Sequence, residues 1–285
     1  MPSFSPNLPR LVGRTLNGLN RVAPAYTGDT LLRLFGRPRT GRLTPADARF
    51  LAGAERTESV TVNQWRVRTY TWNARGTDTV LLLHGWESNT ARWEALIERL
   101  LPTGRRILAF DGPAHGASSG RNFTAIDYAA CIDQILERYP ARTAVAHSLG
   151  GMALTYYLTA YAGSPLQRLA LLGVPSDLEY MMGVFQDILR FDARSRASLE
   201  AAIVRRFGRH PATFSVRQFC AQIDLPALII HDRDDELAPL ADSEAYARLL
   251  DPAELVITEG LGHSLQGEAV YGAIARFVAA EKGGM

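Results

Sequence analysis

The sequence predicts an α/β protein: a doubly wound, mostly parallel sheet with an inserted helical lid. Short, continuously apolar runs recur along the chain, as in strands that are buried on both faces of a sheet. Segments of helical periodicity separate these runs, and repeated strand–helix units imply a parallel sheet with right-handed crossovers. One long helical interval, residues 174–223, interrupts the alternation, and we interpret it as the lid.

The strand pattern begins with a hairpin, in which residues 60–62 and 65–72 flank Asn63-Gln64. The buried strands are expected at residues 79–83, 107–110, 143–146, 169–172, 228–230 and 255–258. The helices between and after them are expected at residues 92–101, 125–138, 152–161, 243–250 and 269–280. A chain of 285 residues suffices for one large α/β domain with insertions, so residues 56–173 and 224–285 are assigned to its core.

The predicted lid holds two apolar stripes at helical spacing. They comprise Leu178, Met181, Met182, Phe185, Ile188 and Leu189, followed by Leu199, Ile203, Val204 and Phe207. Such an insertion is expected over the carboxyl edge of the sheet, where open α/β sheets bind ligands. The arginines of this interval could meet an anionic substrate such as a CoA ester, although a solvated face is the simpler interpretation.

Residues 1–55 are expected to form an N-terminal helical extension. The first 45 residues carry seven arginines and a single acid, Asp29. An amphipathic helix with a basic polar face is predicted by the spacing of Leu8, Leu11, Val12, Leu16, Leu19 and Val22. This helix either docks on a membrane surface or a partner, or packs on the body as an ordinary surface helix. The second interpretation is favoured, because the apolar stripe is modest and lacks aromatic anchors.

The composition argues against several classes of protein. Hydrophobic residues make up 47% of the chain, charged residues 21%, and the net charge of +2 gives no reason to expect a nucleic acid partner. No apolar stretch approaches the roughly 20 residues that cross a bilayer, and no signal peptide is recognisable. Cys131 and Cys220 lack metal-binding spacing, so we expect reduced thiols in a cytoplasmic protein. Without a metal constellation or a glycine-rich phosphate loop, no cofactor is expected.

The candidate nucleophile is Ser148, in the run Ala146-His147-Ser148-Leu149-Gly150-Gly151 after a predicted strand. A strand, a serine between small residues and a helix former together describe a nucleophile elbow. The strand and the helix approach each other closely there, so the residues two before and two after the serine must be small. Gly150 meets this requirement and Ala146 nearly does.

A serine hydroxyl needs a neighbouring base, and in elbow-type folds the chain order is serine, acid, histidine. Five histidines fail this order or adjoin the serine too closely: His84, His115, His147, His210 and His231. His263 remains as the candidate base, in a glycine-rich turn just past the last predicted strand.

The loop after residues 228–230 reads His231-Asp232-Arg233-Asp234-Asp235-Glu236-Leu237-Ala238-Pro239. Here the chain resembles the α/β-hydrolase family, which carries His-Gly-x-x-Asp-x-x-x-Pro in this loop. The resemblance implies that Asp235 is the triad acid, with Asp234 as the alternative. Asp232 replaces the family's glycine, and it is expected to be solvated or bound to the backbone of the loop.

Two further motifs carry the resemblance, which spans about residues 60–280. His84-Gly85-Trp86 is similar to the family's oxyanion loop, which implies that the Trp86 and Leu149 N–H groups hold the oxyanion. A purely packing role is the alternative for Trp86. Residues 111–118 resemble the family's Asp-x-Pro-Gly-His-Gly-x-Ser turn, with Ala114 in place of a glycine.

The resemblance implies a serine hydrolase that cleaves a carboxylic ester of a small acyl substrate through an acyl-serine intermediate. Thioesterase, lactonase and peptidase activity remain open, because the same triad serves all of them. A non-catalytic ligand-binding member is the alternative from another class. The intact Ser–Asp–His set argues against it, since binding alone does not require a triad.

Overall fold

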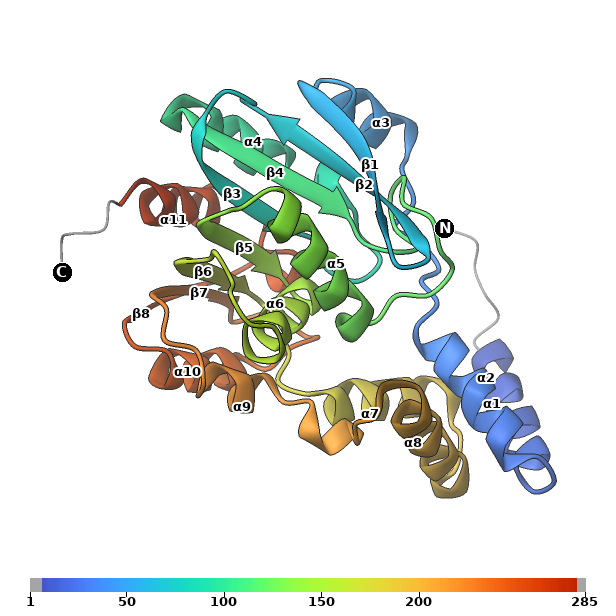
Figure 1. Cartoon of the computed structure of the whole chain (residues 1–285). Helices are drawn as coiled ribbons and strands as arrows, with labels where there is room; N and C mark the ends of the chain where they lie inside the picture. The colour runs from blue at the N-terminus through green and yellow to red at the C-terminus, as the bar shows by residue number, and fades with distance from the viewer. Residues whose placement is uncertain (1–6, 281–285) are drawn as a thin grey trace. The chain divides into compact units, whose positions relative to one another are not determined.

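The computed structural model describes residues 7–280. The first six residues of the predicted N-terminal extension and the last five of the predicted core therefore lie outside the described residues. Contacts within the chain define two units (Figure 1). A helical unit comprises the chain up to Arg37 together with Asp177–Ser215, and an α/β unit comprises Pro38–Ser176 and the chain from Val216 onward.

The α/β unit is built on an eight-stranded sheet with the order β1-β2-β4-β3-β5-β6-β7-β8 (Figure 1). Its strands are β1 Arg56–Val62, β2 Trp65–Trp72, β3 Thr77–Leu83, β4 Arg105–Asp111, β5 Thr143–His147, β6 Arg168–Leu172, β7 Ala227–Asp232 and β8 Ala253–Thr258. Strand β2 runs antiparallel to β1 and β4, and the remaining pairs are parallel. The predicted hairpin and the doubly wound sheet are confirmed.

Helices cover both faces of this sheet, with α5 and α6 on one face and α4 and α11 on the other (Figure 1). The helices of the unit are α3 Pro45–Leu51, α4 Glu94–Leu100, α5 Ala125–Arg138, α6 Leu149–Ala160, α9 Val216–Cys220, α10 Leu240–Leu249 and α11 Glu268–Ala279. Residues 80–83 of β3 and all of β5 are buried. Burial from both sides explains why these strands read as continuous apolar runs.

The helical unit joins segments from distant parts of the sequence. Its helices are α1 Asn7–Asn20, α2 Pro24–Phe35, α7 Leu178–Leu189 and α8 Ala193–Phe207. They share one apolar core, made of Leu16, Leu31, Met182, Leu189, Phe191, Leu199 and Ile203. The Asn17 side-chain oxygen accepts hydrogen bonds from Asp192 N at 2.9 Å and Ser195 Oγ at 3.0 Å. The proposed roles of these segments as a lid or a docking helix stay predictions.

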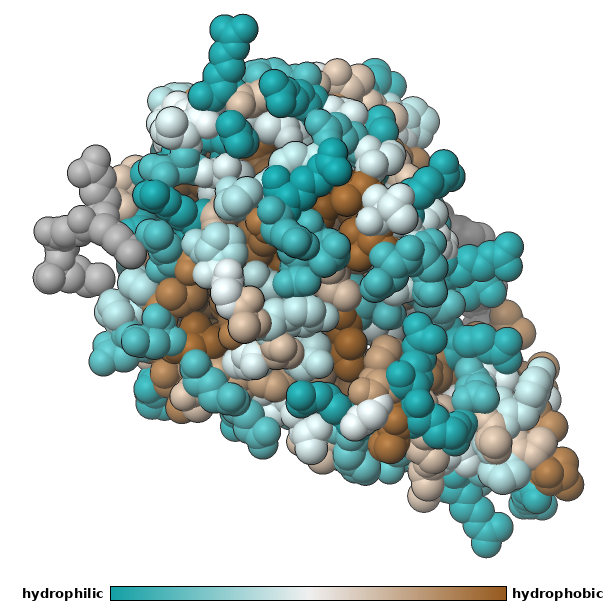
Figure 2. All heavy atoms as spheres, viewed as in Figure 1, coloured by the Kyte–Doolittle hydropathy of each residue, from teal (hydrophilic) through white to brown (hydrophobic). Residues whose placement is uncertain are grey.

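On the face shown in Figure 2, hydrophilic residues cover most of the surface and hydrophobic residues emerge in small, separate areas. In α1, Leu16 is buried, whereas Leu8 and Leu11 are exposed. Among residues 7–280, no helix combines the length and the apolar character needed to span a membrane.

Candidate active site

Ser148 occupies a sharp turn between β5 and α6. Its φ of +51° and ψ of −122° lie outside the regions that most L-residues adopt, and such strain concentrates at functional sites. The Ser148 N–H donates to the Leu172 carbonyl at the end of β6, at 2.9 Å. A Cβ on Gly150 would lie 2.6 Å from the His84 carbonyl oxygen, so this position of the elbow requires glycine.

The structure brings the three predicted residues Ser148, His263 and Asp235 into one hydrogen-bonded triad. His263 Nε2 lies 2.9 Å from Ser148 Oγ, and His263 Nδ1 lies 2.8 Å from Asp235 Oδ2. The other carboxylate oxygen of Asp235 accepts from the Leu237 and Ala238 N–H groups, at 2.8 and 2.9 Å. The Asp235 side chain is 1% exposed and that of His263 is 20% exposed, so the imidazole sits between a buried acid and the serine.

The surroundings of Asp235 keep it ionised. Burial acts to raise the pKa of its carboxyl, but the hydrogen bond from His263 and those from the Ala238 and Leu237 N–H groups outweigh it, so the pKa is lowered. The ionised carboxylate of Asp235 accepts a hydrogen bond from the Nδ1–H group of His263. The Nε2 lone pair then faces Ser148 Oγ and can take its proton.

The neighbouring carboxylates, those of Asp234 and Asp232, accept hydrogen bonds from main-chain N–H groups and not from the His263 imidazole. Asp234 is exposed, and its Oδ2 accepts from Gly260 N at 2.8 Å. Asp232 is fully buried and accepts from the N–H groups of Asp234, Leu261 and Gly262 at 3.0–3.1 Å. Asp232 thereby ties the acid loop to the loop that carries the candidate base.

We expect Asp232→Asn to destabilise the protein by about 1–3 kcal/mol at neutral pH, because an amide N–H₂ would face buried donors. Burial raises the pKa of Asp232, but the hydrogen bonds from the Thr258 hydroxyl and three N–H donors together lower it by a larger amount, so the net shift is downward. The charge therefore stabilises the fold above the unfolded-state pKa of about 4, and this contribution is lost as the pH falls through the folded-state pKa. Urea unfolding at about pH 7 and about pH 3 should show the gap between wild type and variant narrowing in acid. A gap that is constant or widens would contradict this role.

The predicted oxyanion loop lies against the elbow. Strands β3 and β5 are parallel neighbours with Leu83 opposite Ala146, so the segments that follow them meet at the same edge of the sheet. A Cβ on Gly85 would lie 2.9 Å from Ser148 Cβ, so this position requires glycine, and Trp86 is the residue that follows it in the chain. Leu149 is the first residue of α6, so its N–H group has no hydrogen-bond acceptor within the helix.

The Trp86 ring packs on the ring of Phe123, with centroids 6.1 Å apart, and on that of His115, at 5.9 Å. The packing interpretation of this side chain therefore accords with the structure. The oxyanion role concerns the main-chain N–H of the same residue and stays a prediction.

The turn at residues 111–118 is fixed by a buried carboxylate. Asp111 accepts from Thr90 N at 2.9 Å and Ala117 N at 2.8 Å. Burial lowers the pKa of His115 to about 3 and that of His84 to about 4. Each ring accepts a main-chain N–H through Nε2. Both are therefore neutral hydrogen-bonding groups that hold loops in place.

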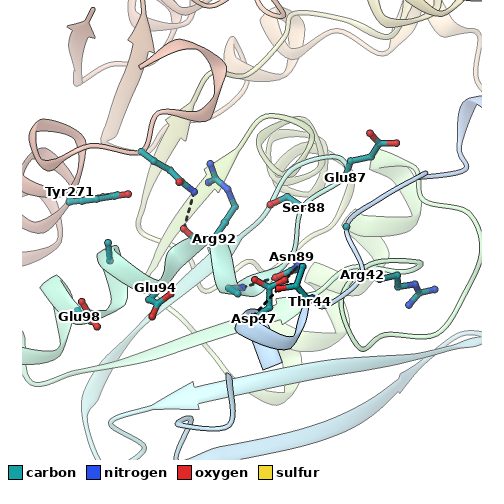
Figure 3. Close-up of a pocket in the computed structure, with 14 residues that line it drawn as sticks. Arg42, Thr44, Asp47, Glu87, Ser88, Asn89, Arg92, Glu94, Glu98 and Tyr271 are labelled. Carbon is teal, nitrogen blue, oxygen red and sulfur yellow. Dashed lines mark hydrogen bonds between the residues drawn. The ribbon is translucent and has the colours of Figure 1, made fainter. Parts of the chain in front are cut away.

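A pocket of about 640 Å³ opens beside the loop of His263 (Figure 3). Arg92, Gln266 and Tyr271 contribute to its lining, and the triad side chains do not. Gln266 Nε2 donates to the Arg92 carbonyl at 3.4 Å, a bond marked by the dashed line beside the label of Arg92 in Figure 3. Arg92 lies outside every motif found in the sequence, so sequence reasoning had no signal for it. Across residues 7–280, no group of three or more His, Cys, Asp or Glu side chains is suited to hold a metal ion.

The sheet and the serine turn at the end of β5 define a class of α/β proteins with a strand–elbow–helix arrangement. A family model described as alpha/beta hydrolase fold matches residues 78–202. This match, together with sequence and structural neighbours from the same superfamily, confirms the resemblance of the motifs to the α/β-hydrolase family.

Relatives at low identity support this resemblance. A non-heme chloroperoxidase from Kitasatospora aureofaciens is 24% identical over 240 residues, which cover 65% of this chain and 85% of that protein. A bifunctional esterase/perhydrolase from Acinetobacter calcoaceticus is 23% identical over 250 residues, which cover 68% and 88%. The solved structure of an esterase from Exiguobacterium antarcticum matches with a TM-score of 0.61 and 18% identity, covering 78% of this chain and 98% of that one. At this identity the structural likeness concerns the fold.

Proposed function

We propose that the protein is a serine hydrolase that cleaves a carboxylic ester through an acyl-serine intermediate. The observation that carries the proposal is the triad, in which His263 lies within hydrogen-bond distance of both Ser148 Oγ and Asp235 Oδ2. The name of one sequence relative, the bifunctional esterase/perhydrolase, supports an ester as the substrate.

In the first half-reaction, Ser148 Oγ attacks the ester carbonyl carbon while its proton passes to His263 Nε2. The N–H groups of Trp86 and Leu149 hold the negative charge that develops on the carbonyl oxygen. The bond to the alkoxy oxygen then breaks, and this oxygen takes the proton from His263. The alcohol leaves, and the acyl group remains bonded to Ser148.

In the second half-reaction, water attacks the acyl carbon and gives a proton to His263 Nε2. The bond to Ser148 Oγ breaks, the serine regains its proton from His263, and the carboxylic acid leaves. Asp235 stays ionised throughout, orienting the imidazole and stabilising the imidazolium in both halves.

A fluorophosphonate probe and short p-nitrophenyl esters test the proposal directly. We expect the probe to modify Ser148, as identified by mass spectrometry of the peptide that contains residues 143–160, and we expect the esters to be hydrolysed. Failure of both would overturn the proposal and favour a ligand-binding protein.

The class of substrate is tested separately with a panel of esters, thioesters, lactones and amides. A kcat/KM highest for a carboxylic ester supports the proposal. Labelling of Ser148 with faster turnover of a thioester, lactone or amide would retain the activated serine but overturn the ester specificity.

A further inference from the structure

The candidate base sits in a turn that is held weakly by its own backbone. His263 belongs to the three-residue 3₁₀ turn Gly262–Ser264, and such turns have poor internal hydrogen-bond geometry. The Leu265 N–H donates back to the Gly262 carbonyl at 3.3 Å. The position of the imidazole relative to Ser148 therefore depends on side chains from other elements.

His147 supplies one of these side chains. Its Nε2 lies 2.7 Å from the main-chain carbonyl oxygen of His263, and the two imidazole rings are 5.0 Å apart between centroids. The residue is 6% exposed, and it directly precedes Ser148 at the end of β5. One hydrogen bond thus connects the elbow of the nucleophile to the turn of the base.

The protonation state of His147 allows its ring to donate a hydrogen bond to the His263 carbonyl. Burial holds the pKa of its imidazole well below the usual value, and the nearby positive charge of Arg92 acts in the same direction. The ring is therefore neutral and carries one N–H. Within residues 7–280, Nδ1 has no hydrogen-bond partner, whereas Nε2 faces a carbonyl, so the N–H belongs on Nε2.

The next carbonyl of the turn is held by a second side chain. Arg92 Nη2 donates to the Ser264 carbonyl at 2.8 Å. The Arg92 guanidinium lies over the Trp93 ring, 4.4 Å from its centroid, and Gln266 donates to the Arg92 carbonyl. The main-chain carbonyls of two successive residues, His263 and Ser264, are thus bound by side chains from different elements.

On the basis of the proposed function, we propose that His147 is a positioning residue, which fixes the His263 base against the nucleophile elbow through the His263 carbonyl. Arg92 serves the same turn at the Ser264 carbonyl. Asp235 fixes the ring of His263 from its Nδ1 side, so His147 adds a constraint on the main chain that the acid does not supply. The constraint matters for proton transfer, which depends on the separation of Ser148 Oγ and His263 Nε2.

The test compares His147→Phe with His147→Gln in the full chain. Phe keeps a ring of similar size but removes the N–H, and we expect kcat for a p-nitrophenyl ester to fall by about 10- to 100-fold with little change in KM. Gln keeps a donor at nearly the same reach and should recover most of kcat. A kcat for the Phe variant equal to that of wild type, or a Gln variant no better than the Phe variant, would overturn the proposal.

Arg92→Met provides a second variant, which keeps the proposal testable should His147→Phe fail to fold. We expect a fall in kcat in the same direction, whereas the same substitution at Arg99, which pairs with Glu268 on the surface, should have no effect. If Arg92→Met retains the kcat of wild type, the assignment of these side chains to the base turn is wrong.

Amide hydrogen exchange tests the link between His147 and the turn of His263 independently of ester hydrolysis. Amides of residues 261–267 should exchange faster in His147→Phe than in wild type, whether or not the protein hydrolyses esters. An inactive, unlabelled wild type would overturn the proposed hydrolase. Unchanged exchange in the variant would overturn the positioning link.

Discussion

Ser148→Ala is expected to lower kcat for ester hydrolysis by about 10⁵- to 10⁶-fold and to abolish labelling by a fluorophosphonate. The loss is this large because Oγ is the atom that forms the bond to the acyl group, and the groups around it cannot substitute for it. The fold should survive, since alanine tolerates the φ of +51° as well as serine does and the backbone N–H of residue 148 still reaches Leu172. Stopped-flow measurement with p-nitrophenyl butyrate gives kcat, and circular dichroism checks the fold.

The matched control is Ser59→Ala, which removes an exposed serine hydroxyl on β1. This variant should keep both kcat and labelling. A folded Ser148→Ala variant with kcat within tenfold of wild type would mean that another nucleophile carries the reaction, and the proposed function would fail.

The fold was predictable from the sequence because its central strands are buried on both faces. Strands such as β3 and β5 must then be apolar along their whole length, and this pattern is visible without knowledge of their partners. The elbow was predictable because the requirement for a small residue falls at a fixed spacing from the serine, on Gly150, although the carbonyls that impose it belong to Leu83 and His84. In both cases the constraint leaves its pattern within one short run of the sequence, whichever residues impose it.

The parts that escaped prediction depend on contacts between distant residues. Nothing near Asn17 in the sequence indicates that its side chain accepts from Asp192 and Ser195, so the shared core of α1, α2, α7 and α8 could not be anticipated. The link from His147 to His263 escaped for the same reason. His147 is too close to the serine along the chain to act as its base, but its imidazole reaches the main-chain carbonyl of His263, the candidate base.

Asp235→Asn is expected to lower kcat by about 10⁴-fold while leaving KM within a few-fold of wild type. An asparagine oxygen can still accept from the Leu237 and Ala238 N–H groups, which turns the amide nitrogen toward His263 Nδ1. The imidazole must then carry its proton on Nε2, where it donates to Ser148 Oγ instead of accepting from it. The tautomer is wrong for a general base, and no charge remains to stabilise the imidazolium.

Asp234→Asn is the decisive comparison, because Asp234 was the alternative acid on sequence grounds. Its carboxylate is exposed and accepts from Gly260 N, a bond that an asparagine oxygen can retain, so kcat should stay within about twofold of wild type. Parallel measurement of the two variants with one ester separates the neighbouring acids under identical conditions. A large loss in Asp234→Asn with little loss in Asp235→Asn would reverse the assignment. Equal, small losses in both would show that the acid contributes little, and the imidazole would then be oriented chiefly by its main-chain contacts.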